Sequence, residues 1–282
     1  MRPVRGVTIV VAIAIAWPAL VFGRSQSADQ VLRQAEAVRN PELTYAVDFT
    51  IHGVSRGETV AERDASYSLI ANGKNRSVIL MRSPDSLFGG LMLMVDGKYW
   101  MLLPKASRPW ELSGAQIRNG DVATGDLARV NLTRGYKASI AGDETVEAEP
   151  CWRLELTSHD PAAYYARIVY WIAKNGSLPK KLEFRGGEGT LLKTIQYSDY
   201  RTGALGLRPM RLTIESLDEW KESGTLTFAN LRAFDRKRLS FTPDGLFVLR
   251  DAALASRGRA GRTDVAIEQM LAPRLSGSIG MR

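Results

Sequence analysis

The sequence contains a single cysteine, Cys151, and only two histidines, His52 and His159. One cysteine cannot form an intrachain disulfide and cannot build a thiolate zinc site, and two histidines argue against a histidine-rich metal site. A lone cysteine between Pro150 and Trp152 at the start of a strand-like segment is typical of a small buried apolar side chain. We therefore expect Cys151 to be structural, and we expect no metal and no cofactor.

Two common catalytic motifs are absent as well. The chain has no H-E-x-x-H pair and no G-x-x-x-x-G-K-[ST] loop. His159 and Asp160 stand before a proline without a placed nucleophile, and Asp121 and Asp126 fit the N-caps of short helices. We therefore expect no enzymatic activity and no catalytic residues.

The charge balance is only mildly basic, with 38 Lys and Arg against 30 Asp and Glu. This excess does not require a nucleic-acid partner, and we expect none. Hydrophobic residues make up 45% of the 282 residues, which is enough apolar material for the core of one large domain or two small ones. The composition therefore excludes a wholly disordered chain.

Long apolar runs are confined to the N-terminus. Arg2 and Arg5 precede the apolar residues 7–22, and small residues follow, so residues 1–23 are predicted to be a signal peptide. Cleavage after Gly23 or Ser27 fits a small-residue rule, and an uncleaved N-terminal anchor is the alternative. Both interpretations predict an exported protein.

The residues after this run predict one helix followed by many strands. Ser27 and Gln30 form a capping-box pattern, and helical apolar spacing continues to Asn40, which predicts a helix over residues 27–40. From residue 43 the apolar period changes to two. The strand-like segments are residues 44–52, 64–71, 76–82, 91–96, 98–103, 109–112, 137–141, 151–158, 166–173, 179–186, 189–197, 208–217 and 223–230. The turns between them include Asn72-Gly73, Asp96-Gly97, Gly142-Asp143, Asn175-Gly176 and residues 186–189. Such short turns join antiparallel neighbours, so we predict a mainly β protein built as a long antiparallel meander.

Several of these segments are apolar on one side only. Residues 152–156, 181–185 and 211–215 alternate apolar with charged or polar side chains. A single sheet of this many strands with one apolar face must curl around its own side chains, around helices or around a ligand. Residues 117–136 interrupt the strand pattern with an apolar stripe that includes Leu127 and Val130. This segment is either a lid over the curved sheet or a fixed core helix.

The order of several motifs resembles the LolA-like, outer-membrane lipoprotein-sorting protein family. The resemblance spans residues 28–245 and is strongest in a tryptophan-leucine-proline hairpin and an Asn-Gly-Asp sequence. The motifs that carry it are residues 87–94, 96–104, 119–123 with Tyr136, 151–156, 164–171, 178–184, 191–195 and 208–210.

The resemblance implies an open, curved antiparallel sheet, a half-barrel, with a few helices covering its concave apolar face. It also implies a periplasmic carrier that binds an acyl chain of a lipoprotein or another lipid and transfers it between the envelope membranes. An inner-membrane exporter of the RND type is the implied protein partner, and we expect the carrier to be a monomer. The alternative function is an accessory or scaffold subunit of an RND-type export complex that carries no lipid.

We predict that apolar side chains from the one-sided strands and from the interrupting segment line the cavity, with ordinary core packing as the alternative for each of them. The candidates are Phe88, Met92, Met94, Trp100, Leu102, Leu127, Val130, Trp152, Leu154, Leu156, Ile168, Tyr170, Leu182 and Phe184. The carrier domain is predicted over residues 24–250. Residues 251–282 form a basic C-terminal region that is interpreted as a solvated tail with a short helix at 263–271, or as a contact for anionic headgroups.

Overall fold

The computed structural model describes residues 26–56, 60–72, 76–113, 132–160, 163, 165–217, 222–233 and 241–257. The predicted signal peptide, the predicted helix at 263–271 and most of the segment 117–136 lie outside the described residues. The helical elements are α1 (Ala28–Arg39), the 3-10 turn η1 (Asp85–Leu87), α4 (Leu132–Gly135) and α5 (Gly245–Ser256). The strands are β1 (Tyr45–Arg56), β2 (Val60–Asn72), β3 (Arg76–Ser83), β4 (Leu91–Val95), β5 (Lys98–Leu102), β6 (Trp110–Glu111), β7 (Tyr136–Val146), β8 (Glu149–Ser158), β9 (Arg167–Ala173), β10 (Pro179–Arg185), β11 (Leu191–Gly203), β12 (Gly206–Ser216) and β13 (Glu222–Ala233).

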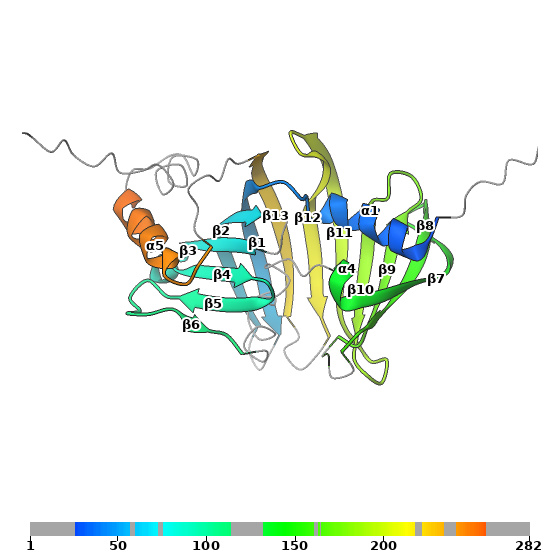
Figure 1. Cartoon of the computed structure of the whole chain (residues 1–282), viewed down its shortest axis with the longest axis horizontal. Helices are drawn as coiled ribbons and strands as arrows, with labels where there is room; N and C mark the ends of the chain where they lie inside the picture. The colour runs from blue at the N-terminus through cyan, green and yellow to red at the C-terminus, as the bar shows by residue number, and fades with distance from the viewer. Residues whose placement is uncertain are drawn as a thin grey trace, which may run out of the picture.

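All thirteen strands belong to one antiparallel sheet that is curved and open (Figure 1). The order of the strands is β6-β5-β4-β3-β2-β1-β13-β12-β11-β10-β9-β8-β7. The predicted mainly β fold and each predicted strand are confirmed. The single long meander is corrected, because the sheet consists of two meanders, β1–β6 and β7–β13, that are joined where β1 pairs with β13.

Two of the predicted turns illustrate how glycine is used. Asp96 and Gly97 both have positive φ and form the two-residue turn that pairs Val95 with Lys98. Gly142, in contrast, lies inside β7 at a shift of the register, where its φ of 152° accommodates a bulge. The predicted turn at Gly142-Asp143 is therefore wrong, and the chain turns instead at residues 147–148.

Helix α1 packs on one face of the sheet, which we call the inner face. Ser27 caps the helix by accepting a hydrogen bond from the Gln30 backbone N–H, and Val31, Leu32 and Ala35 point into the core. The helix contacts β7, β10 and β12 and lies in front of the β9–β12 region in Figure 1. The guanidinium group of Arg208 on β12 donates hydrogen bonds to carbonyl oxygens in the last turn of the helix. The inner face of the C-terminal meander is therefore covered by the N-terminal helix.

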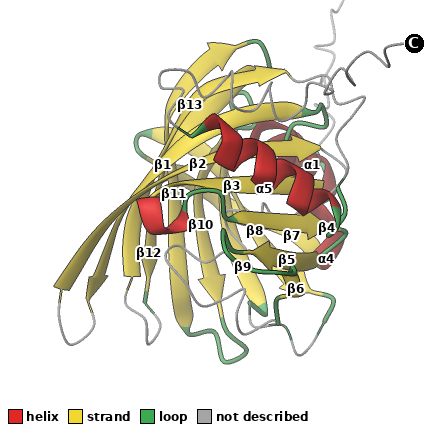
Figure 2. Cartoon of the chain, turned by 90° about the vertical axis from the view of Figure 1, so that its left-hand side faces the viewer, coloured by secondary structure: helices red, strands yellow, loops and turns green. Residues whose placement is uncertain are grey.

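Helix α5 packs on the opposite face, which we call the outer face, over the other meander. Leu246, Leu249 and Ala253 are buried against side chains of β2, β3, β4 and β5, and Figure 2 shows α5 lying across these strands. The helix continues to Ser256, past the predicted domain boundary at residue 250. No helix in the described part of the chain is long and apolar enough to cross a membrane.

Candidate functional site

The inner face of the C-terminal meander brings together six of the predicted lining residues. Leu154 on β8 stands opposite Tyr170 on β9, which stands opposite Leu182 on β10. The next row pairs Leu156, Ile168 and Phe184 in the same way. All six side chains are buried and belong to the same hydrophobic cluster as α1. These six predicted lining residues are therefore part of the core beneath α1.

Trp152 occupies the end of this row and is less enclosed. It stands opposite Ile172 on β9 and packs against the same cluster, but its side chain is only partly buried. The prediction that Trp152 faces the same way as Leu154 agrees with this placement. Its open position makes it a candidate contact for a ligand as well as a part of the core.

The inner face of the N-terminal meander carries methionines and aromatic rings. Met92 and Met94 on β4 point into the large inner cluster, and Met101 on β5 packs against it. The ring of Phe49 on β1 stacks on Tyr67 of β2 at a centroid distance of 4.9 Å and lies 5.9 Å from the ring of Phe228 on β13. Further side chains that pack on the inner cluster and stay partly exposed are Tyr67, Met101, Leu112, Leu212, Phe228 and Leu231.

Three predicted lining residues lie elsewhere. Trp100 and Leu102 on β5 belong to the outer cluster beneath α5, because the register pairs them with Leu93 and Leu91 rather than with the methionines of β4. Phe88 follows η1, and the guanidinium carbon of Arg257 lies 5.1 Å from its ring. These three side chains are removed from the lining of the inner face.

The predicted stripe of the interrupting segment is described only at its end. Leu127 and Val130 lie outside the described residues. Leu132 begins α4, is 1% exposed and packs in the inner cluster with α1. The last part of the segment is therefore part of the core.

A buried polar cluster beneath α1 was not predicted from the sequence. Glu36 is 4% exposed, and its carboxylate accepts two hydrogen bonds of 2.8 Å from the guanidinium group of Arg39. The same carboxylate accepts hydrogen bonds from the Asn40 side chain at 3.3 Å and from the backbone N–H of Leu132 at 3.2 Å. Burial works against the charge of Arg39, but the Glu36 carboxylate outweighs it and raises the pKa of Arg39 above its ordinary value. The cluster therefore ties α1 to α4 with a paired charge.

Two tyrosines beside this cluster have buried hydroxyl groups. Within the described part of the chain, neither the Tyr170 nor the Tyr200 hydroxyl has a hydrogen-bond partner. Burial is the main cause that raises the pKa of both phenols, and the negative charge of Glu36 adds to the shift at Tyr170. Both groups are therefore neutral near pH 7 and can act as hydrogen-bond donors.

The inner face is mainly apolar. Its side chains are aliphatic, aromatic and thioether groups, and its main ion pair, Glu36 with Arg39, is engaged by α1 and α4. Among the described residues, no group of three or more His, Cys, Asp and Glu side chains could hold a metal ion. Cys151 is fully buried, in agreement with its predicted structural role, and lies in a small cluster with Val169 and Trp171 on the outer face.

Comparisons with known proteins agree with this architecture. A LolA superfamily protein from Nitrosomonas europaea is 29% identical, with a TM-score of 0.69, and the match covers 78% of this chain and 99% of that chain. A DUF1329 family protein from Desulfovibrio piger is 18% identical with a TM-score of 0.67, and the match covers 79% and 100% of the two chains. A structure described as an outer membrane lipoprotein-sorting protein domain, from Vibrio parahaemolyticus, is 17% identical with a TM-score of 0.65, and the match covers 78% and 97%.

None of the curated proteins that were compared matches the chain. A family model whose description is that of an uncharacterized protein matches residues 73–246, which is more than half of the sequence. This match, the likeness to the Nitrosomonas protein and the open half-barrel lead to the same assignment. The chain belongs to the LolA-like family.

Proposed function

We propose that this protein is a periplasmic carrier that binds an acyl chain of a lipoprotein or another lipid on its inner face and transfers it between the envelope membranes. The observation that carries the proposal is the continuous apolar inner face of an open sheet, on which large side chains of β2, β5, β12 and β13 stay partly exposed. Family membership supports the same role. The carrier needs no catalytic group.

The side chains of the inner face meet the energetic requirement of such a carrier. An acyl chain of about sixteen carbons costs on the order of 12 kcal/mol to leave in water, at about 0.8 kcal/mol for each methylene. Aromatic rings and flexible thioethers provide a surface that adapts to such a chain. We place the acyl chain over the N-terminal meander and the adjoining strand β13, on the aromatic group of Phe49, Tyr67 and Phe228 and on the neighbouring methionines.

The part of the C-terminal meander beneath α1 has a different role in this proposal. Its inner face is already covered by α1, which fills the place that an acyl chain would take. Leu154, Leu156, Ile168, Tyr170, Leu182 and Phe184 therefore act as the core that holds the half-barrel open. Movement of α1 would be needed before these residues could contact cargo.

Export to the periplasm is part of the proposal. It rests on the apolar residues 7–22 that follow Arg2 and Arg5, and on membership of a family whose relatives include a lipoprotein-sorting domain. Sequencing of the mature N-terminus from a periplasmic fraction tests it. A first residue between Arg24 and Asp29 is expected, and recovery of Met1 would contradict it.

The binding role is tested first by the cargo that the protein retains. The protein is purified from a periplasmic extract without detergent, and organic extracts of it are analysed by mass spectrometry. Fatty-acyl species in a fixed ratio to protein are expected. An extract free of lipid, together with tight binding to a membrane protein, would favour the scaffold function instead.

A pair of variants on β13 tests where the acyl chain binds. Phe228 is partly buried on the inner face, whereas its neighbour Thr227 is partly buried on the outer face and stands opposite Arg211. Phe228→Asp should weaken binding of a fluorescent fatty acid at least tenfold, because a carboxylate is placed where the chain lies. Thr227→Asp should leave binding within about twofold. Thermal melting of both variants checks that they fold, and equal affinities would exclude this part of the inner face.

A further inference from the structure

A row of cationic side chains crosses the outer face at one end of β7, β8, β9 and β10. Lys137 stands opposite Thr157, Thr157 opposite Arg167, and Arg167 opposite Arg185. Four neighbouring strands thus place three cations and one hydroxyl group side by side. Like charges on directly opposite residues destabilise a sheet, so this row has a cost that a bound anion would remove.

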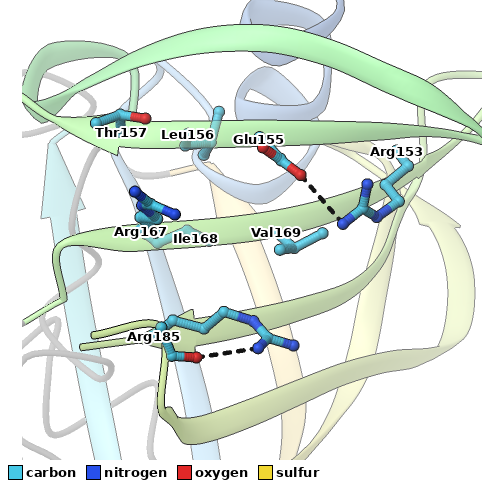
Figure 3. Close-up of a pocket in the computed structure, with 9 residues that line it drawn as sticks. Arg153, Glu155, Leu156, Thr157, Arg167, Ile168, Val169 and Arg185 are labelled. Atoms are coloured by element: carbon cyan, nitrogen blue, oxygen red, sulfur yellow. Dashed lines mark hydrogen bonds and ion pairs between the residues drawn. The ribbon is translucent and has the colours of Figure 1, made fainter. Parts of the chain in front are cut away.

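The row borders a pocket of about 410 Å³ in the outer face. Figure 3 shows that Arg153, Glu155, Thr157, Arg167 and Arg185 contribute side chains from three neighbouring strands. Leu156, Ile168, Val169 and Gly189 complete the lining. The pocket is separated by the sheet from α1 and from the inner face, so it is distinct from the proposed acyl site.

Carboxylates neutralise only part of this charge. Glu155 pairs with Arg153 at 3.1 Å, and Glu183 accepts hydrogen bonds from Lys181 at 2.7 Å and from Arg185 at 2.5 Å. Within the described part of the chain, Arg167 forms no ion pair. The same is true of Lys137 on the edge strand β7.

Arg185 has one more unsatisfied group. One of its terminal nitrogens donates to the carbonyl oxygen of Gly189 at 3.1 Å, but its Nε is buried and has no partner among the described residues. The arginine is thus held in place by Glu183 and Gly189 while one donor remains available. A fixed guanidinium group beside a free one at Arg167 is an arrangement suited to a bidentate oxyanion.

We propose that this pocket binds the phosphate group of a phospholipid headgroup and so docks the outer face on an anionic membrane surface. The guanidinium groups and the Thr157 hydroxyl match phosphate oxygens, and the volume exceeds what a lone phosphate ion fills. Lys137 extends the positive row to the edge of the sheet, where a membrane surface can approach. The inner face stays open during this contact, because it lies on the other side of the sheet.

Vesicle binding of a double variant tests the proposal. Lys137→Gln combined with Arg167→Gln removes the two cations that lack ion pairs, and Lys105→Gln combined with Arg211→Gln removes the same charge from exposed positions away from the pocket. The purified protein is titrated at low salt with vesicles of equal parts phosphatidylglycerol and phosphatidylcholine. The pocket variant should bind about thirtyfold more weakly, from about fivefold for each cation, and the control variant no more than about threefold more weakly.

Each outcome decides the proposal. Equal losses in the two double variants would show attraction by net charge alone, and no binding by the unchanged protein would also overturn the pocket. Displacement from vesicles by millimolar inorganic phosphate, with equal affinity for phosphate and glycerol phosphate in calorimetry, would assign the pocket to a free anion instead. Circular dichroism and thermal melting verify that both double variants fold.

The fatty-acid assay on the same samples separates this proposal from the acyl-carrier function. Both double variants should bind the fluorescent fatty acid as the unchanged protein does, because the altered side chains avoid the inner face. A protein that binds vesicles through the pocket but binds no fatty acid would refute only the carrier function. A protein that binds fatty acid but not vesicles would refute only the pocket.

Discussion

Removal of the buried charge of Glu36 should strongly destabilise the protein. The substitution Glu36→Gln keeps the shape of the side chain but deprives Arg39 of its counter-charge, and the side chain of Arg39 is only 14% exposed. Breaking a buried ion pair by removing one partner costs about 3–5 kcal/mol, because the remaining charge stays desolvated. This is a large fraction of the 5–15 kcal/mol that typically separates folded from unfolded protein.

The assay is urea unfolding at pH 7, followed by tryptophan fluorescence. With a slope of about 2–3 kcal/mol per molar urea, the midpoint should fall by about 1–2 M. Glu111→Gln is the matched control, because Glu111 is 53% exposed and lies 4.0 Å from Lys98. It should change the unfolding free energy by less than about 1 kcal/mol.

A second variant distinguishes a lone buried charge from lost packing. Glu36→Leu combined with Arg39→Leu removes both charges and leaves mainly the backbone N–H of Leu132 without its acceptor, at a cost of about 1–3 kcal/mol. The double variant should therefore be more stable than Glu36→Gln alone. A loss below about 1 kcal/mol for Glu36→Gln, or a double variant that is less stable than the single one, would refute this reasoning.

Three further predictions concern the core, the outer face and the cysteine. Leu154→Ala should lower the unfolding free energy by about 2–5 kcal/mol, because Leu154 is fully buried. Ile140→Ala on the neighbouring strand should cost less than about 1 kcal/mol, because the Ile140 side chain is 40% exposed. Equal losses in the two variants would mean that the β7 edge is covered. Burial opposes the charge of Glu183, but hydrogen bonds from two basic neighbours outweigh burial and lower the pKa of Glu183 below the ordinary 4.5. The charged carboxylate therefore stabilises the folded protein above pH 4.5, and this stabilisation disappears as the pH falls through the lower pKa of the folded state. Unfolding free energies measured from pH 7 to pH 3 should therefore fall less steeply in Glu183→Gln, and parallel curves would contradict this. Burial raises the pKa of Cys151, so its thiol should react with Ellman's reagent only after unfolding in urea, and rapid reaction in the native protein would contradict the fully buried position.

Local pairing of strands was predictable because short turns determine it. A two-residue turn at Asp96-Gly97 pairs Val95 with Lys98, and counting outward places Met92 opposite Met101. The same count places Trp100 on the other face. The predicted lining grouped Met92 with Trp100. The sequence of β4 gives no contrast between the two faces, because its residues are buried on both.

Long-range pairing had no comparable signal. The contact of β1 with β13 joins Phe49 to Phe228 across most of the chain, and no turn or spacing indicates it. It depends instead on how two apolar faces meet once both meanders exist. This is why the sequence predicted one meander where the structure has two.

Some of the features that were not predicted do have a recognisable pattern in the sequence. Leu246, Leu249 and Ala253 follow helical spacing and could have predicted α5, which spans the predicted domain boundary at residue 250. Glu36 and Arg39 are three residues apart in α1, and Glu36 adjoins its apolar stripe. The pairing of these two charges could therefore have been predicted from the sequence. The hydrogen bond from the Leu132 backbone N–H to Glu36 could not, because it depends on a distant segment.

The two terminal helices each cover the meander that lies at the far end of the chain. Helix α1 needs β10 and β12 before it can bury Leu32, and α5 needs β2–β5 before it can bury Leu246. A chain that emerges from its N-terminus therefore exposes its first helix until most of the protein has followed, and the first meander lacks its outer cover until residue 253 arrives. Neither meander can therefore bury both of its faces until the other end of the chain has been synthesised.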